Sequence, residues 1–471
     1  MTQAQLGRQL HLDATFGSGG FAIASPAAVV GLEYANVGLA QVTGGRLIAG
    51  GTGLIGETDH FYLTGHAPDG GLDASFGHNG EVVSSIEARG WALAVQPASR
   101  APHPLGRPTG EMVLIGGQAY DPATGNLVFA VQRYTLAGRL DTSFGSGGTV
   151  LQDLAPINGP ADSDEEWCWA LAIQPGVGIL GAGYAVKPDG SRGAMARWHF
   201  DGRLDTTFNG RHGRLIYPAL DAPADPNGMV TNTAFTCIAM QENGRILVGG
   251  TYGAQFLVAR LMPDGSLDPS FGQGGLVFLT LGLGLAGIPT LRVQPDGRIV
   301  LMASVGAVTG PGPDDFASGI GVARLLPNGD LDPTFGRLVT TNFGPPFNRP
   351  GGRVTYRLGW NIEVLSAPGS DNGVNDAVLQ PGAREGIIGV GGTKNLSAFQ
   401  GDFLVARFLA DGDVDTLSTG PAGAVESPVP GGGGQISTAV YNEDAHALTV
   451  AGGVYSEGRT GIGLARYLLP A

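Results

Sequence analysis

The sequence predicts an all-β fold: a seven-bladed β-propeller with four-stranded blades. Three features predict it, namely a phrase that recurs along the chain, four short apolar runs in each unit, and an incomplete unit at either end. The composition agrees, because 81 glycines and 31 prolines accompany an ordinary apolar fraction of 42%. This combination is typical of many short strands joined by tight turns.

The recurring phrase reads LDATFGSGG at 12–20, LDTSFGSGG at 140–148 and LDPSFGQGG at 267–275. Its aspartate returns every 60 to 68 residues through six copies, and a degenerate seventh follows after 83 residues. The seven aspartates are Asp13, Asp73, Asp141, Asp205, Asp268, Asp332 and Asp415. A period of this length indicates a repeat architecture in which each unit is one small sheet.

The unit that ends with the copy at Asp268 shows the predicted elements in order. Its strands are FTCIAMQ, RILVGG, QFLVARL and LVFLTL, at 235–241, 245–250, 255–261 and 276–281. The turn ENG follows the first strand and MPDG follows the third, and Asx-Gly turns of this kind suit hairpins. The strands are continuous apolar runs, which indicates sheets that are covered on both faces, as packed blades are.

The two ends of the chain hold complementary fragments of one unit. The sequence begins with the phrase and one strand, FAIAS, and ends with three strands, ISTAVYN, ALTVAGG and GIGLARYLL. We therefore expect a single domain over 1–471, in which blade seven combines 435–469 with 9–25. The N-terminal strand would close the ring and remove the exposed edge of the last sheet.

The phrase resembles the delta-60 repeat, LDxxFGxxG, which follows a segment like AVQPDGKILVGG. The matching segments are LAVQP at 93–97, MQENGRILVGG at 240–250 and VQPDGRIVLMAS at 293–304. The resemblance covers almost the whole chain and implies a propeller in a largely bacterial, often exported family. It implies no common activity, and the copy at Asp415 departs from it by lacking the phenylalanine and the first glycine.

An arginine stands eight residues before the aspartate in five units, and we expect each arginine to bond its aspartate. The expected pairs are Arg133–Asp141, Arg197–Asp205, Arg260–Asp268, Arg324–Asp332, Arg407–Asp415 and, across the chain ends, Arg466–Asp13. Gly65 takes the arginine position before Asp73, which must find another partner. We interpret the pairs as structural, because a calcium loop needs several closely spaced oxygens and these turns offer one or two. No cofactor is expected.

Function is expected in the insertions that break the repeat. Most of them fall on one face, which the links between units and between second and third strands share. The largest is 342–373, where we expect an added hairpin formed by 353–358 and 361–366. The candidate binding residues on this loop-rich face are Asp162, Asp164, Glu165, Glu166, Trp167, Trp169, Tyr356, Trp360 and Asp376.

Aromatic platforms beside carboxylates suit sugars, peptides or cations. The alternative interpretation is that the carboxylates are only solvated and the aromatic residues anchor the loops. Trp91 and Trp169 occupy equivalent positions in adjacent units, which favours packing for both.

Several function classes are disfavoured. A net charge of −14 argues against nucleic acid as a partner, and no apolar run approaches the length of a membrane span. No signal peptide is visible at the N-terminus. The eight histidines are scattered, and no phosphate-binding loop or serine elbow occurs. The two cysteines, Cys168 and Cys237, are expected to be buried thiols.

The sequence thus favours a non-catalytic recognition module that binds a protein or a glycan through the loop-rich face. One alternative is a hydrolase or lyase with its site at the mouth of the central channel, near Asp376 and the acidic residues of 162–169. The other is a structural subunit of a larger assembly.

Overall fold

The computed structural model describes most of the chain and is almost entirely β-structure. The described residues are 9–24, 31–99, 108–154, 165–187, 190–210, 212–217, 232–281, 287–308, 316–336, 338–343, 350–357, 360–363, 371–381, 385–394, 401–419, 424–456 and 459–469. The helices in these ranges are a 3-10 turn at Thr43–Gly45 and the single-turn α2 (Thr416–Thr419). Within the same ranges no helix is long and apolar enough to cross a bilayer.

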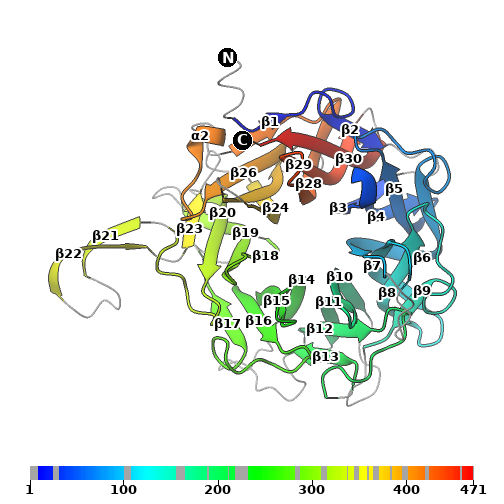
Figure 1. Ribbon diagram of the computed structural model, residues 1–471, viewed down its shortest axis with the longest axis horizontal. Coiled ribbons are helices and arrows are strands. Elements are labelled where there is room, and N and C mark those ends of the chain that lie inside the picture. Colours follow the sequence, from blue (N-terminus) through cyan, green and yellow to red (C-terminus); the bar gives the residue numbers. More distant parts are fainter. Residues whose placement is uncertain are drawn as a thin grey trace.

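The sheets stand side by side in a ring around a central axis, which is the arrangement of a β-propeller (Figure 1). Each unit of the ring is an antiparallel meander, and the strands nearest the axis include β3 (Gly31–Gln41), β10 (Glu166–Gln174), β14 (Thr233–Met240), β18 (Thr290–Val293), β24 (Asp371–Gln380) and β28 (Gly432–Asn442). Clusters of buried side chains lie between neighbouring sheets; Leu114 of one sheet, for example, packs with Ile179 of the next. This packing explains why the strands are apolar on both faces.

Strands β3 to β9 form one continuous sheet that bends around the ring. They are β3 (Gly31–Gln41), β4 (Leu47–Ile55), β5 (Thr58–His66), β6 (Glu81–Gln96), β7 (Met112–Asp121), β8 (Asn126–Thr135) and β9 (Thr149–Gln152). Strand β6 belongs to two meanders: up to Glu87 it pairs with β5, and from Ala88 it pairs with β7. The outer strand of one unit therefore continues directly into the inner strand of the next.

Two separate four-stranded sheets follow, each in simple sequence order. The first contains β10 (Glu166–Gln174), β11 (Gly178–Lys187), β12 (Gly190–Trp198) and β13 (Arg214–Tyr217). The second contains β14 (Thr233–Met240), β15 (Ile246–Tyr252), β16 (Gln255–Leu261) and β17 (Leu276–Leu279). The strands of the second sheet match those predicted for the unit around Asp268 to within a few residues.

The next two sheets are also four-stranded. One contains β18 (Thr290–Val293), β19 (Ile299–Val308), β20 (Phe316–Leu325) and β23 (Trp360–Glu363). The other contains β24 (Asp371–Gln380), β25 (Gly386–Lys394), β26 (Phe403–Leu409) and β27 (Ala424–Ser427).

The large insertion pairs differently from the prediction. The hairpin expected between 353–358 and 361–366 is wrong: β22 (Pro350–Arg357) pairs with β21 (Leu338–Phe343), and β23 pairs with β20. The third strand of each sheet needs an outer neighbour to bond its backbone N–H and C=O groups. For β20, that neighbour is β23. The two-stranded β21–β22 sheet projects outward from the ring (Figure 1).

The ends of the chain meet in one sheet, as predicted. Its strands are β28 (Gly432–Asn442), β29 (Ala447–Ser456) and β30 (Arg459–Leu468), together with β1 (His11–Leu12) and β2 (Phe21–Ala24). Phe21 lies opposite Ala465 and Ala24 opposite Ile462, so that β2 covers the outer edge of β30. The N-terminal strand therefore removes the free edge that the last sheet would expose.

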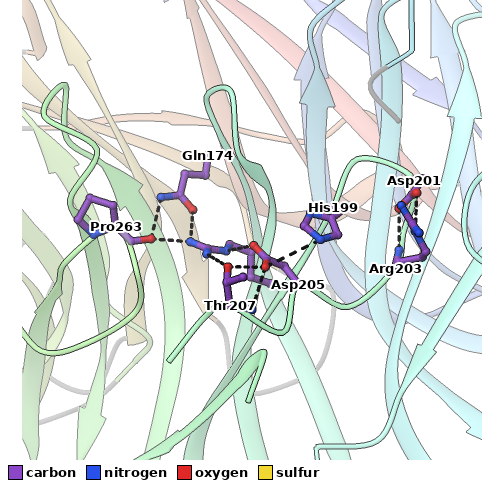
Figure 2. Close-up of polar contacts among 8 residues, drawn as sticks. Gln174, His199, Asp201, Arg203, Asp205, Thr207 and Pro263 are labelled. Atoms are coloured by element: carbon purple, nitrogen blue, oxygen red, sulfur yellow. Dashed lines mark hydrogen bonds and ion pairs between the residues drawn. The ribbon is translucent and has the colours of Figure 1, made fainter. Parts of the chain in front are cut away.

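The repeated phrase is a clamp between neighbouring sheets (Figure 2). Arg197 Nε donates to Asp205 Oδ2 at 2.8 Å, and its Nη1 donates to the carbonyl oxygen of Pro263 in the next unit. The Thr207 hydroxyl, two residues after the aspartate, donates to Asp205 Oδ1 at 2.6 Å. The guanidinium carbon also lies 4.7 Å from the ring centroid of Phe208. Each polar member of the phrase thus has a defined partner.

The same contacts recur around the ring. The aspartate–arginine ion pairs are Arg133–Asp141, Arg197–Asp205, Arg260–Asp268, Arg324–Asp332, Arg407–Asp415 and Arg466–Asp13. Asp73, which lacks the usual arginine, is bonded instead by Arg46 Nη2 at 2.5 Å. Arg46 enters from the turn before β4, the position from which Arg245 and Arg298 give Asp268 and Asp332 a second ion pair.

A glycine in the turn before the next copy of the phrase allows the close contact between units. The Gly145 backbone N–H donates to the Asp201 carbonyl oxygen of the following turn at 2.7 Å. In that turn Gly202 has φ of +87°, and a Cβ there would lie 2.6 Å from the Gly145 nitrogen. Only glycine combines this backbone conformation with so close an approach.

Because the aspartates of the phrase form ion pairs in the folded protein, we expect the protein to lose stability in acid. For Asp268, burial raises the pKa, but hydrogen bonds from Ser270 and the charges of Arg260 and Arg245 outweigh it, and the pKa is about 2. A carboxyl group whose pKa falls on folding stabilises the protein above its unfolded pKa, and this stabilisation is lost as pH falls through the folded value. We expect the free energy of unfolding to drop between pH 4 and pH 2.

The measurement is urea unfolding across that pH window, for the wild type and for Asp268→Asn. The variant should be less stable at pH 5, and its stability should depend less steeply on pH. An equal slope in the two proteins would show that Asp268 contributes nothing to the acid transition.

Candidate functional site

The inner strands line a half-open cavity of about 220 Å3 on the axis of the ring. Every inner strand in the ring contributes to it: β3, β6, β10, β14, β18, β24 and β28. Its polar lining includes Thr236, Thr290, Arg292, Asn375, Asp376, Ser437 and Thr438. The cavity lies at the point where all units meet, so a ligand there would touch side chains from the whole repeat array.

Irregular pairing turns particular side chains toward this cavity. The register between first and second strands shifts around Trp91, Trp169, Thr236, Asn375 and Ser437. Each of these five residues is the extra residue of a β-bulge, and each lines the cavity. A bulge re-aims one side chain without disrupting the rest of the strand. In five of the units the repeat thus places one variable side chain on the axis.

One side of the lining is aliphatic and aromatic. It consists of Val37, Gly38 and Leu39 of β3, Trp91, Ala92 and Leu93 of β6, and Trp169, Ala170 and Leu171 of β10. The Trp91 and Trp169 rings stack, with centroids 5.3 Å apart and planes inclined by 17°. Trp167 packs against the same pair and stacks on Tyr184. The stacked rings form a rigid wall that loses little conformational entropy on binding.

The opposite side is polar and centres on Asp376, which is 9% exposed. Its Oδ1 accepts hydrogen bonds from Thr290 Oγ1 at 3.1 Å, Arg292 Nη2 at 2.5 Å and the Ala377 amide at 2.8 Å. Its Oδ2 accepts from Thr438 Oγ1 at 3.0 Å and the Ala439 amide at 3.1 Å. Five donors on one carboxylate tie β18, β24 and β28 together and neutralise the charge.

We expect Asp376→Asn to lower the free energy of unfolding by about 2–3 kcal/mol, because an amide nitrogen would face donors that now bond an anion. Urea unfolding measures this loss. The matched control is Asp296→Asn, whose side chain is 50% exposed and pairs with Arg298 at the surface; it should change stability by less than about 0.5 kcal/mol. Equal effects of the two substitutions would contradict the structural role of Asp376.

The acidic and aromatic candidates from the sequence separate into three groups. Asp162 and Asp164 lie outside the described residues, and the side chains of Tyr356 and Trp360 also lie outside them. Glu166 is not a surface residue, since it is fully buried and both carboxylate oxygens accept from the Leu154 amide. Glu165 accepts a hydrogen bond from Gln118 Nε2 at 3.3 Å.

Three of the remaining candidates border or support the cavity. Trp169 and Asp376 line it from opposite sides, and Trp167 packs behind Trp169. The polar cavity residues outside these candidates are Thr236, Thr290, Arg292, Asn375, Ser437 and Thr438. Their signal was positional: Ser437 precedes TAVY as Asn375 precedes DAVL, at the same point of the repeat.

Neither cysteine behaves as a reactive group. Both thiols are free, and burial raises the pKa of Cys168 to about 12 and that of Cys237 to about 11. Cys237 lines the cavity but stays protonated at neutral pH, which removes its nucleophilicity. In the described part of the chain no three His, Cys, Asp or Glu residues converge as a metal site.

Comparison with known proteins yields one family and several distant structures. Residues 241–271 and 294–335 match the family described as "Domain of unknown function (DUF5122) beta-propeller". No curated protein matches the chain.

Three solved structures illustrate the distant similarity. The polysaccharide lyase Uly1 is 10% identical, with a TM-score of 0.45 over 100% of this chain and 96% of that one. An α-L-arabinanase of Penicillium chrysogenum, complexed with arabinobiose, is 12% identical, with a TM-score of 0.40 over 77% and 91%. Sqt1 of Chaetomium thermophilum, bound to the N-terminus of ribosomal protein L10, is 13% identical, with a TM-score of 0.40 over 95% and 100%. At these identities and scores the similarities carry no argument about activity.

Proposed function

We propose that the protein is a non-catalytic recognition module that binds a protein or glycan ligand at the mouth of its central channel, on the loop-rich face. The observation that carries this proposal is the ring of bulges, which directs Trp91, Trp169, Thr236, Asn375 and Ser437 into one cavity. Bulges that re-aim side chains are typical of functional positions. The cavity supplies an aromatic platform and directional polar groups, which is the usual composition of a ligand site.

The chemistry of the cavity supports binding over catalysis. A general acid or base needs a proton or lone pair that it can exchange with a substrate. Asp376 accepts five hydrogen bonds from the protein itself, which leaves it in a structural role. A hydrolase or lyase at this mouth would have to draw its acid and base from elsewhere, such as the acidic segment that includes Asp162 and Asp164.

The proposal includes the architecture that carries the site: a single domain of seven four-stranded blades, each built from one delta-60 unit. The shared strand β6 supports this count, since it serves as the outer strand of one blade and the inner strand of the next. The pairing of β2 with β30 supports the completion of the last blade by the N-terminus. The Arg/Asp pairs are proposed to be architectural, since each holds its phrase against the adjoining turn.

The test probes immobilised glycans and a peptide library with the intact protein, and assays each bound compound for conversion. We expect a ligand whose affinity falls at least tenfold in Trp169→Ala. Tyr120→Ala is the matched control, because this aromatic side chain is 52% exposed and lies outside the cavity. Conversion of the ligand would refute the non-catalytic assignment, and equal binding by both variants would place the site elsewhere.

A further inference from the structure

We propose that the axial cavity binds a single neutral sugar ring, as the terminal residue of a glycan. This inference rests on the proposed function and names the ligand class for the same site. It follows from three properties of the described lining: its division into two chemically different sides, its hydrogen-bonding polarity and its charge.

The division into two sides matches the faces of a sugar ring. Leu39, Leu93 and Leu171 lie on the same side as the stacked Trp91 and Trp169 rings. A pyranose or furanose presents C–H groups on its faces and hydroxyl groups around its rim. The C–H face suits the aromatic wall, and the rim then lies toward the polar side.

The polar side presents acceptors, which suits a ligand rich in O–H donors. Thr438 donates its hydroxyl hydrogen to Asp376, and the lone pairs of its oxygen remain as acceptors. Thr290 is oriented by the same carboxylate, and Thr236 donates to the Pro289 carbonyl oxygen at 3.1 Å. Asn375 donates from Nδ2 to the Ile436 carbonyl oxygen at 2.6 Å, which leaves its Oδ1 as an acceptor.

Asp376 therefore acts as a positioning residue. It fixes the Thr438 and Thr290 hydroxyl groups as donors to itself, so that the lone pairs of Thr438, and the one that Arg292 leaves on Thr290, are oriented before the ligand arrives. Preorganised groups of this kind lower the entropic cost of binding.

Charge selects against ionic ligands. The ionised side chains that line the cavity are Arg292 and Asp376, and they neutralise each other at 2.5 Å. The Arg292 Nη atoms are already bonded to Asp376, Thr290 and the Leu291 carbonyl oxygen. A carboxylate on the sugar would have to compete with Asp376 for the Arg292 guanidinium, and a cation would have to compete with Arg292 for Asp376. The ligand class is therefore a neutral sugar.

The cavity volume suits one sugar ring. Its volume of about 220 Å3 is below the range of about 300–1,000 Å3 that drug-sized ligands occupy. A longer glycan would place its terminal ring in the cavity and extend toward the loop-rich face.

The test is isothermal titration calorimetry of the full chain with methyl glycosides of neutral hexoses and pentoses. Parallel titrations use glucuronate and a set of short peptides. We expect saturable binding of at least one neutral glycoside, and at least tenfold weaker binding of glucuronate. Thr438→Val should weaken the neutral glycoside at least fivefold, while Thr438→Ser, which keeps the hydroxyl, should retain binding. Unchanged thermal unfolding in both variants would exclude misfolding as the cause.

The outcomes separate this inference from the proposed function. Binding of glucuronate or of a peptide at the cavity, without a neutral glycoside, would overturn the sugar assignment and leave the recognition module intact. Conversion of a bound glycoside would overturn the non-catalytic assignment and leave the sugar site intact. Failure of every neutral glycoside to bind, or equal binding by Thr438→Val, would overturn the inference.

Discussion

Replacement of Arg197 by alanine is expected to lower the free energy of unfolding by about 3–5 kcal/mol. The Arg197 and Asp205 side chains are 5% and 4% exposed, so the substitution leaves a buried carboxylate without its counter-ion. It also removes the hydrogen bonds to Gln174 and to the Pro263 carbonyl oxygen of the next unit. The loss therefore weakens the contact between two sheets as well as one ion pair. Urea unfolding at pH 7 measures it.

Arg203→Ala is the matched control for this prediction. Arg203 also forms an ion pair, with Asp201 at 2.7 Å, but its side chain is 72% exposed (Figure 2). Exposed pairs contribute about 0–1 kcal/mol, so the variant should differ little from the wild type. If the two substitutions have similar effects, the clamp interpretation of the repeated phrase is wrong.

Phe21→Ala is expected to destabilise the protein by about 3–5 kcal/mol, the usual cost of truncating a buried phenylalanine. Phe21 is 6% exposed and belongs to the core cluster between the last two sheets. Its ring lies 5.8 Å from that of Phe403, which is far away in the sequence. The contact depends entirely on the return of the N-terminus to β30, so its loss reports on ring closure.

The control for Phe21→Ala is Leu417→Ala, because Leu417 lies in α2 and is 86% exposed. Thermal unfolding should show a large decrease for Phe21→Ala and almost none for Leu417→Ala. A stability loss below about 1 kcal/mol for Phe21→Ala would mean that β2 contributes little to the last sheet.

Ring closure and the Arg/Asp contacts were predictable because both follow from the spacing of the repeat along the sequence. The repeat defines the length of each unit, and the two chain ends hold complementary parts of one unit. The N-terminal strand β2 is therefore expected to pair with β30, the last strand of the chain. The spacing of eight residues returns the chain through a turn, which brings Arg197 and Asp205 together. The partner of Asp73 was not predictable in this way, because Arg46 reaches it from a different turn.

The cavity was only partly predictable. A bulge inserts one residue without changing the apolar run around it, so the apolar pattern alone does not reveal that Trp169 or Ser437 turns toward the axis. Glu166 was misassigned because a run of acidic residues resembles a solvated loop. In β10 it shares the buried side with Cys168, while Trp167 and Trp169 take the other side. Strand alternation, rather than charge, determines that Glu166 is buried, and the bulge at Trp169 turns that ring into the cavity.

The pairing of the large insertion was wrong for a related reason. Proximity in sequence favoured a hairpin of 353–358 with 361–366. Instead, β23 pairs with the open edge of β20, and β22 pairs with β21. Pairing at the edge of β20 is favoured over a local hairpin, because the backbone groups of β20 would otherwise lack hydrogen-bond partners.

The central claim is that the chain forms a ring closed by its own N-terminus. Hydrogen–deuterium exchange of the peptide that contains Phe21–Ala24 tests this claim most directly, with the amides of β29, Ala447–Ser456, as the internal reference. If the ring is closed in this way, both segments exchange slowly and lose protection together as urea is added. Exchange of Phe21–Ala24 at the rate of an unstructured chain, while β29 stays protected, would contradict it.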